Sequence, residues 1–300
     1  MSLLIPPYLT KGDTVVIIAT ARKISDAELH PTIAILNSWG LVAELAPNLF
    51  KSHNQFSGSD EERTEDLQWA LNHKTAKAIL IARGGYGTLR IIDNVNFTEF
   101  KKNPKWLIGY SDVTVLHSHL QSIGIVSLHA TMPVNFLQHE EATLSIKKLL
   151  FNERIKYNIP VHPLNKRGFA EGIVVGGNLS LLYALSGSPS EIEFDNKILF
   201  IEDLDEFLYH VDRMMLQLKR SGKLKNLAGL IVGGMSEMKD NSISFGKNAE
   251  EIIFDAVAEY AYPVCFNFPA GHIEENMAFY LGKPASLDVR ADHVDFNYLK

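Results

Sequence analysis

Short apolar runs alternate with helical segments through the first 133 residues, and this alternation is the feature that most limits the fold. The runs are nearly continuous, as in strands buried on both faces of a sheet. We therefore expect a parallel sheet covered by helices on both faces. The expected strands lie at 13–20, 41–47, 76–85, 105–111 and 124–133, and the expected helices at 26–40, 59–73 and 113–123.

The pattern loosens at 151–168, which is polar and contains two prolines. This segment is the best candidate boundary, and it predicts an N-terminal domain at 1–153 and a C-terminal domain at 154–300. Further strands are expected at 169–185, 197–205, 227–235 and 262–272. Tight turns are the expected role of the glycine pairs in "VVGGN" and "IVGGM". One long helix is expected from a shared apolar face, made of Leu204, Leu208, Val211, Met215 and Leu218.

Composition excludes several classes of protein. The formal net charge of −6 gives no reason to expect a nucleic-acid or anionic-membrane partner. The lone cysteine, Cys265, permits no intrachain disulfide and is expected to be a core residue. The first residues lack the basic start of a signal peptide, and no apolar run reaches the length of a membrane span. We expect a cytoplasmic protein.

Ser111 lies at an unusual place, in "KWLIGYSDVTVLHSHL". An apolar run before it predicts a strand, and helical spacing begins directly after Asp112. A serine on a strand-to-helix turn is either a helix N-cap or the nucleophile of a hydrolase elbow. The elbow pattern is only half matched, because Gly109 is present but Val113 replaces the second glycine. Both interpretations stay open on this stretch alone.

A nucleophilic serine needs a base and an acid that orients the base. His129 and His272 both follow expected strands, so either could reach the edge of a sheet where Ser111 lies. His117 and His119 are two apart on a helix and make a poor metal pair. Acids follow the strand in "LFIEDLDEF", where Glu202 ends the apolar run and Asp203 comes next. We expect Asp205 and Glu206 to lie at the start of the long helix, because a helix N-terminus attracts negative charge.

The glycine-rich stretch "ARGGYGTLR" lacks the G-K-[ST] ending of a P-loop and the G-x-G-x-x-G spacing of a dinucleotide-binding fold. Such a loop can instead present a backbone N–H to a developing oxyanion, which needs close approach without a Cβ. The chain contains no C-x-x-C pair, no H-E-x-x-H and no basic aromatic patch. Metal and nucleic-acid sites are therefore not expected.

Taken together, these segments resemble the LD-carboxypeptidase family, the serine peptidases of the cytoplasmic murein-recycling type. The resemblance implies a flavodoxin-like α/β N-terminal domain with a parallel sheet, a smaller and mostly β C-terminal domain, and a homodimer. It is specific because the matching segments occur in order along most of the chain. They are "ARGGYGTLRIID", "LIGYSDVTVLH", "LHATMP", "VVGGNLSLL", "LFIEDLDEFLYHVDRMMLQL", "GLIVGG" and "FPAGHIEEN".

The resemblance also implies roles for individual residues. Ser111 corresponds to the nucleophile, Glu202 to the acid and His272 to the base, which leaves His129 as a pocket-wall or structural residue. The implied oxyanion donors are the backbone N–H groups of Gly85 and Asp112. A further set of candidate substrate-binding residues is Arg83, for a substrate carboxylate, with Gly84 and Tyr86 beside it.

The chain departs from the family's pattern at two places. Family members often have a Pro-Ser pair after the first strand, where this chain has "IIATARKIS", and a glycine where Ala130 follows a histidine. The segments that carry the implied triad are intact, so these departures concern substrate fit.

The expected function is a cofactor-free and metal-independent carboxypeptidase that releases terminal D-alanine from a murein tetrapeptide. One alternative is a hydrolase of a peptidyl-nucleotide antibiotic of the microcin C type. A more distant alternative is a non-catalytic module that binds an anionic ligand at the glycine-rich edge.

Overall fold

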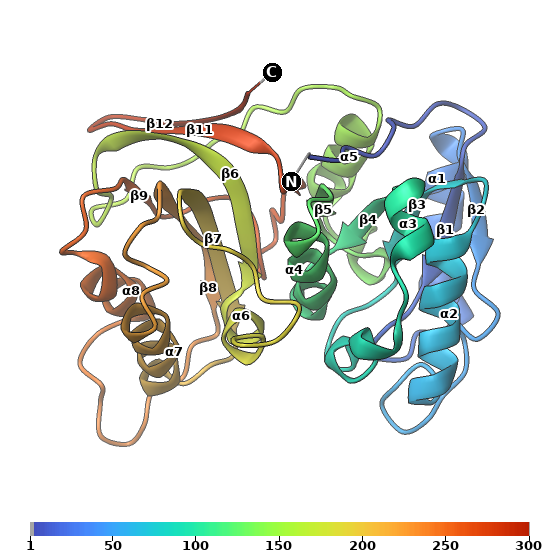
Figure 1. Cartoon of the computed structure of the whole chain (residues 1–300), viewed down its shortest axis with the longest axis horizontal. Coiled ribbons are helices and arrows are strands. Elements are labelled where there is room, and N and C mark those ends of the chain that lie inside the picture. Colours follow the sequence, from blue (N-terminus) through green and yellow to red (C-terminus); the bar gives the residue numbers. More distant parts are fainter. Residues whose placement is uncertain (1–2, 300) are drawn as a thin grey trace.

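The computed structural model describes residues 3–299 and consists of two six-stranded sheets, side by side (Figure 1). The first sheet has the order β10-β5-β4-β3-β1-β2, and five of its strands run parallel, as the sequence predicts. β10 is antiparallel to β5 and comes from far along the chain. The strands are β1 (Thr14–Ile18), β2 (Val42–Leu45), β3 (Ala76–Ile81), β4 (Trp106–Gly109), β5 (Ser127–His129) and β10 (Phe279–Leu281).

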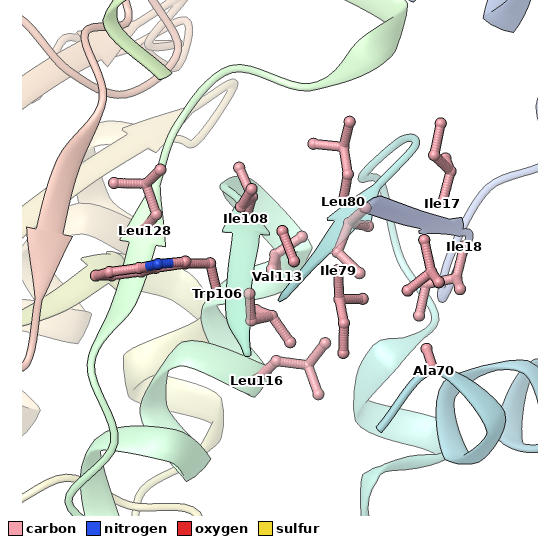
Figure 2. Packing of buried hydrophobic residues seen from close by; sticks show 14 of the residues in the cluster. Ile17, Ile18, Ala70, Ile79, Leu80, Trp106, Ile108, Val113, Leu116 and Leu128 are labelled. Atoms are coloured by element: carbon pink, nitrogen blue, oxygen red, sulfur yellow. The ribbon is translucent and has the colours of Figure 1, made fainter. Parts of the chain in front are cut away.

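Helices cover the first sheet. α1 and α2 each begin after a capping serine, since Ser25 and Ser59 each form a capping box with the glutamate three residues later. Figure 2 shows how the core forms: Ala70 of α2 and Leu116 of α4 point toward Ile79 and the neighbouring strand residues. The helices are α1 (Asp26–Ser38), α2 (Asp60–Asn72), α3 (Thr98–Lys102), α4 (Thr114–Ser122) and α5 (Glu140–Leu150).

The second sheet has the order β12-β11-β6-β7-β8-β9, with β6 to β9 parallel and β11 and β12 antiparallel. Alternate residues of its central strands face different layers. Leu199 packs with residues of α7 and α8, whereas Phe200 packs on the other face with residues of β11 and β12, the two antiparallel strands of the same curved sheet (Figure 1). The elements are β6 (Gly168–Asn178), α6 (Leu179–Ala184), β7 (Lys197–Leu204), α7 (Leu208–Arg220), β8 (Gly229–Ser236), α8 (Ala249–Val257), β9 (Val264–Cys265), β11 (Pro284–Val289) and β12 (Val294–Tyr298).

The glycine pairs after the second-half apolar runs are not turns, so that prediction is wrong. Gly176 and Gly177 lie within β6, and the pair in "IVGGM" lies within β8. Their missing side chains allow close packing. A Cβ at Gly176 would overlap the carbonyl oxygen of Phe200, and one at Gly177 would lie 2.5 Å from Thr114 Oγ1.

The long helix also begins later than its apolar face predicts. Leu204 is the last residue of β7, and α7 starts at Leu208. Asp205 has a positive φ of 63° and forms an ion pair with Lys239. Asp205 and Glu206 therefore precede the helix and are not part of its first turn.

α4 lies between the two sheets and joins them (Figure 1). The backbone N–H of Asn178, at the end of β6, donates to Thr114 Oγ1 in the first turn of α4 at 3.0 Å. The Asn178 side chain in turn donates to Asp203 Oδ1 on β7 at 2.9 Å. This buried polar chain ties the start of α4 to the carboxyl ends of β6 and β7. Within residues 3–299, no helix is both long enough and apolar enough to cross a membrane.

Candidate active site

Ser111 lies on a strained turn between β4 and α4. Its φ is +64°, a left-handed conformation that a serine rarely adopts and that often marks a functional position. A short 3₁₀ turn over Ser111–Val113 then leads into the helix. No side-chain capping bond forms at the start of either the turn or the helix. The helix-cap interpretation of Ser111 is therefore wrong, and the strand-turn-helix geometry of an elbow is present.

Two glycines allow close packing around the turn that carries Ser111. A Cβ at Gly109, whose φ is +159°, would lie 2.8 Å from a methyl of Val113. A Cβ at Gly84, in the loop after β3, would lie 3.2 Å from Ser111 Cβ and 3.4 Å from Ser111 Oγ. In a usual elbow the second glycine of the motif leaves space beside the serine. Here Gly84, in a different loop, leaves that space.

His272 faces Ser111 from the second half of the chain. Its Nε2 is 3.1 Å from Ser111 Oγ, and its Nδ1 is 2.6 Å from Oε2 of Glu202. The backbone N–H of His272 donates to the same carboxylate oxygen at 3.0 Å. Gly271 allows this close approach, because a Cβ there would lie 2.7 Å from Glu202 Cβ. Ser236 Oγ donates to the carbonyl oxygen of His272 at 2.6 Å, which holds the loop from its other side.

The surroundings of His272 favour its charged form. Burial lowers the pKa of His272, but the charge and the hydrogen bond of Glu202, together with the charges of Asp203 and Glu237, raise it by more, so the net pKa lies above the ordinary value. Glu202 itself is fully buried. The Tyr110 ring lies 4.8 Å from the imidazole, and burial together with the Glu202 charge raises the pKa of Tyr110 to about 12. The Tyr110 hydroxyl is therefore uncharged at neutral pH, and the Tyr110 ring lines the site beside His272.

Asp203 is a second buried carboxyl beside Glu202. It accepts hydrogen bonds from the Asn178 side chain and from the backbone N–H groups of Ser180 and Leu204. Burial, and then the charge of Glu202, raise the pKa of Asp203 to about 7. The sequence marks Asp203 only as the neighbour of Glu202. Asp203 is connected to Thr114 through Asn178, because β6 pairs with β7. These segments are far apart in the sequence, so no local pattern predicts the contact.

The glycine-rich loop after β3 lies against the elbow. Gly85 has a φ of +113°. The carboxyl of Asp112 accepts the backbone N–H of Thr88 at 2.9 Å, which ties the loop to the turn that carries Ser111. Burial raises the pKa of this carboxyl. Within residues 3–299, the backbone N–H groups of Gly85 and Asp112 donate to no other group of the protein.

Two other candidate substrate-binding residues flank this loop. Arg83 has its Nη1 3.2 Å from Glu28 Oε1, and it also donates to the carbonyl oxygen of Lys23 at 3.4 Å. Tyr86 is partly exposed, and its ring lies 6.3 Å from that of Phe56. Arg83 is thus already paired with a carboxylate of its own chain.

The remaining histidines do not contact Ser111. His129 is fully buried behind Tyr110 with a ring separation of 5.8 Å, and burial lowers its pKa well below the ordinary value. Buried His117 contacts Ser127 Oγ and the carbonyl oxygen of Gly109, both at 2.8 Å. His119 contacts Ser190 Oγ instead. Across the described residues, no group of three or more histidine, cysteine, aspartate or glutamate side chains is arranged to hold a metal ion.

A hydroxyl, an imidazole and a buried carboxylate therefore form one hydrogen-bonded chain. Nδ1–H of His272 donates to Glu202, which leaves Nε2 as the acceptor for the Ser111 proton. Such a chain can raise the nucleophilicity of a hydroxyl and then stabilise the imidazolium that forms.

Comparison with known proteins identifies the family of the chain. Residues 15–130 match the LD-carboxypeptidase N-terminal domain, and residues 171–287 match the LD-carboxypeptidase C-terminal domain. A probable murein peptide carboxypeptidase of Bacillus subtilis is 35% identical over 290 residues, which cover 94% of this chain and 91% of the relative.

Solved structures show the same architecture. The muramoyltetrapeptide carboxypeptidase of Oxalobacter formigenes superposes with a TM-score of 0.86 at 28% identity, over 96% of this chain and 99% of that one. The microcin C7 self-immunity protein MccF superposes with a TM-score of 0.87 over 99% of each chain, at 19% identity, which indicates a common fold alone. By its sequence relatives and its matched domains, the chain belongs to the LD-carboxypeptidase family and is a serine-type carboxypeptidase.

Proposed function

We propose that this enzyme hydrolyses the L,D-peptide bond before the terminal D-alanine of murein tetrapeptides, with Ser111, His272 and Glu202 as its catalytic triad. The hydrogen-bonded chain from Ser111 Oγ through His272 to Glu202 is the observation that carries the proposal. The relatives add support for the substrate, since one is named a probable murein peptide carboxypeptidase and another a muramoyltetrapeptide carboxypeptidase.

In the first half of the reaction, His272 Nε2 takes the proton of Ser111 as Oγ attacks the scissile carbonyl carbon. Glu202 holds the imidazole in the required tautomer and stabilises its charged form. The imidazolium then protonates the nitrogen of the leaving D-alanine, and an acyl-enzyme on Ser111 remains. In the second half, His272 takes a proton from water as the water oxygen attacks the ester carbon. The imidazolium then returns this proton to Ser111 Oγ as the ester bond breaks and the shortened peptide leaves.

The tetrahedral intermediates carry a negative oxygen that needs hydrogen-bond donors. We assign this role to the backbone N–H groups of Gly85 and Asp112, which have no acceptor within residues 3–299. A donor of this kind contributes roughly 2.7–4 kcal/mol to the stabilisation of the transition state in comparable sites. Because Asp112 also anchors the loop through Thr88, its side chain keeps the two donors in one arrangement.

The same proposal covers the surroundings of the site. Arg83, Gly84 and Tyr86 form one wall of the substrate cleft, with Gly84 leaving space for the peptide beside Ser111. The enzyme works without a metal or cofactor, in the cytoplasm, on peptides recovered from peptidoglycan. We also propose a homodimer, which light scattering of the purified protein would test.

The substrate is tested by offering defined peptides and identifying the products by mass spectrometry. We expect release of D-alanine from a tetrapeptide with a terminal D-residue, no release from its terminal L-alanine isomer, and unchanged rates in the presence of a chelator. An aminoacyl sulfamoyl adenosine is the matched alternative substrate. Cleavage of that compound without cleavage of the tetrapeptide would contradict the proposal.

A further inference from the structure

Arg22 lies across the glycine-rich loop beside the nucleophile. Its backbone N–H donates to the carbonyl oxygen of Gly84 at 3.3 Å, and the residue also forms a bridge with Phe56. Its side chain covers Gly85. A Cβ on Gly85 would lie 2.6 Å from Cγ and Cδ of Arg22 and 2.9 Å from its Nε. The absence of a side chain at Gly85 is therefore what lets Arg22 extend over the loop.

The side chain of Arg22 packs against the glycine-rich loop at the residue next to the one that approaches Ser111. The Cβ position of Gly84 is 3.4 Å from Ser111 Oγ, and Gly85 is the next residue. With a Cα–Cα step of about 3.8 Å, Arg22 Nε can lie at most about 13 Å from that hydroxyl. A peptide poised for attack needs a cation about 11 Å or less from Oγ to contact its terminal carboxylate. Because the Arg22 side chain is exposed, it can rotate to bring its guanidinium within that distance.

The charge of Arg22 is also unpaired, in contrast to the arginines around it. Within residues 3–299, its guanidinium forms no ion pair and donates no hydrogen bond. Arg63 and Arg90 both pair with Asp60, and Arg83 pairs with Glu28. An anion that reached Arg83 would compete with Glu28, whereas an anion that reached Arg22 would displace only water.

We propose that Arg22 binds the C-terminal carboxylate of the peptide substrate and so restricts hydrolysis to the last peptide bond. This inference rests on the proposed function and assigns the carboxylate to Arg22 in place of Arg83. A guanidinium suits the task because its planar fork can donate two parallel hydrogen bonds to one carboxylate.

The experiment compares two tetrapeptides that differ only at the terminus, one ending in D-alanine and the other in D-alaninamide. The wild-type enzyme should prefer the free acid. Arg22→Gln should lower kcat/KM for the acid by about 10- to 100-fold, mostly through KM, and leave the amide nearly unchanged. Arg22→Lys should recover part of the preference, because it keeps the charge without the fork. Arg83→Gln is the matched control and should leave the acid-to-amide ratio unchanged.

If Arg22→Gln keeps the wild-type ratio of kcat/KM for the acid to kcat/KM for the amide, the inference is overturned. If only Arg83→Gln loses the preference for the acid, the carboxylate is assigned to Arg83. Labelling of Ser111 by an uncharged fluorophosphonate should be equal in all variants, which shows that the nucleophile is intact.

Binding of both peptides to Ser111→Ala separates this inference from the proposed function, because it needs no turnover. If the wild type fails to cleave the peptides, acid-selective binding that Arg22→Gln abolishes still supports the role of Arg22. Binding without selectivity, or no binding of either peptide, overturns it.

Discussion

Nε2 of His272 lies 3.1 Å from Oγ of Ser111, although 161 residues separate the two along the chain. Ser111 follows a strand of the first sheet, and the loop of His272 packs on the end of the second sheet through Glu202 and Ser236. The contact therefore exists only when the two sheets are docked. Activity should respond to changes in the packing between the sheets as strongly as to changes in the triad itself.

Glu202→Gln should reduce kcat by about 10⁴-fold, because an amide can hold the imidazole in the wrong tautomer and cannot balance its positive charge. The substitution preserves the volume of a fully buried side chain, so the folded structure should persist. Steady-state kinetics with the tetrapeptide measure the effect. A fall of less than tenfold would argue against Glu202 as the orienting acid.

The pH dependence should report His272. Glu202 raises the pKa of His272 above its ordinary value of about 6.5, so kcat/KM should rise with pH to a midpoint above that value. In Glu202→Gln, the charge and the charged hydrogen bond that do most to raise the pKa of His272 are lost, so the midpoint should move down. The same raised pKa stabilises the folded protein below about pH 6.5, and this stability is lost as the pH rises through the pKa in the folded state. An identical midpoint in both enzymes would refute the coupling.

His117 and His129 should make the protein sensitive to acid. Burial lowers the pKa of His117 to about 4 and that of His129 well below its ordinary value. The unfolded chain therefore takes up protons below about pH 6.5 that the folded protein does not, and stability falls from there toward pH 4 by at most about 1.4 kcal/mol per pH unit per histidine.

His129→Leu should lose less stability between pH 7 and pH 5 and should retain most of its activity. Denaturant unfolding at the two pH values, alongside the tetrapeptide assay, measures both effects. Complete inactivity of this folded variant would instead identify His129 as the base.

Gly177→Ala should disturb the docking of the sheets. The new methyl group would lie 2.5 Å from Thr114 Oγ1, at a φ of +147°. We expect a loss of about 1–3 kcal/mol of stability together with a lower kcat. Gly222→Ala is the matched control, since its φ is also positive at +80° and its new methyl group would meet nothing within 4 Å.

Adding Thr114→Ala to Gly177→Ala removes the overlapping atoms and should restore part of the activity. A control variant that loses as much activity as Gly177→Ala would show that backbone strain, and not the contact with Thr114, is responsible.

Local patterns in the sequence predicted the first half well. The continuous apolar runs at 13–20, 76–85 and 105–111 contain the buried strands β1, β3 and β4, as expected. The strand-to-helix turn at Ser111 was also predicted from local spacing. The left-handed φ of Ser111 was not predicted, because the elbow pattern is incomplete: Val113 occupies the place of its second glycine. The space beside Ser111 comes instead from Gly84, in a different loop.

Long-range pairing was the part that local patterns missed. β10 joins the first sheet beside β5, although it follows the expected boundary by more than a hundred residues. The glycines of β6 have no local signature that separates a turn from a close strand contact, since the atoms they approach belong to β7 and α4. The division at 153/154 remains a prediction, and β10 shows that the second segment contributes to the first sheet.

Loss of D-alanine release in Ser111→Ala tests the central claim most directly. The variant should match the wild-type melting temperature, and its rate on the tetrapeptide should fall by at least about 10⁴-fold, because no other hydroxyl replaces the nucleophile. Ser221→Ala, just beyond the end of α7, is the serine control and should retain the wild-type rate. Persistent release of D-alanine by folded Ser111→Ala, at a rate near that of the control, would contradict the account.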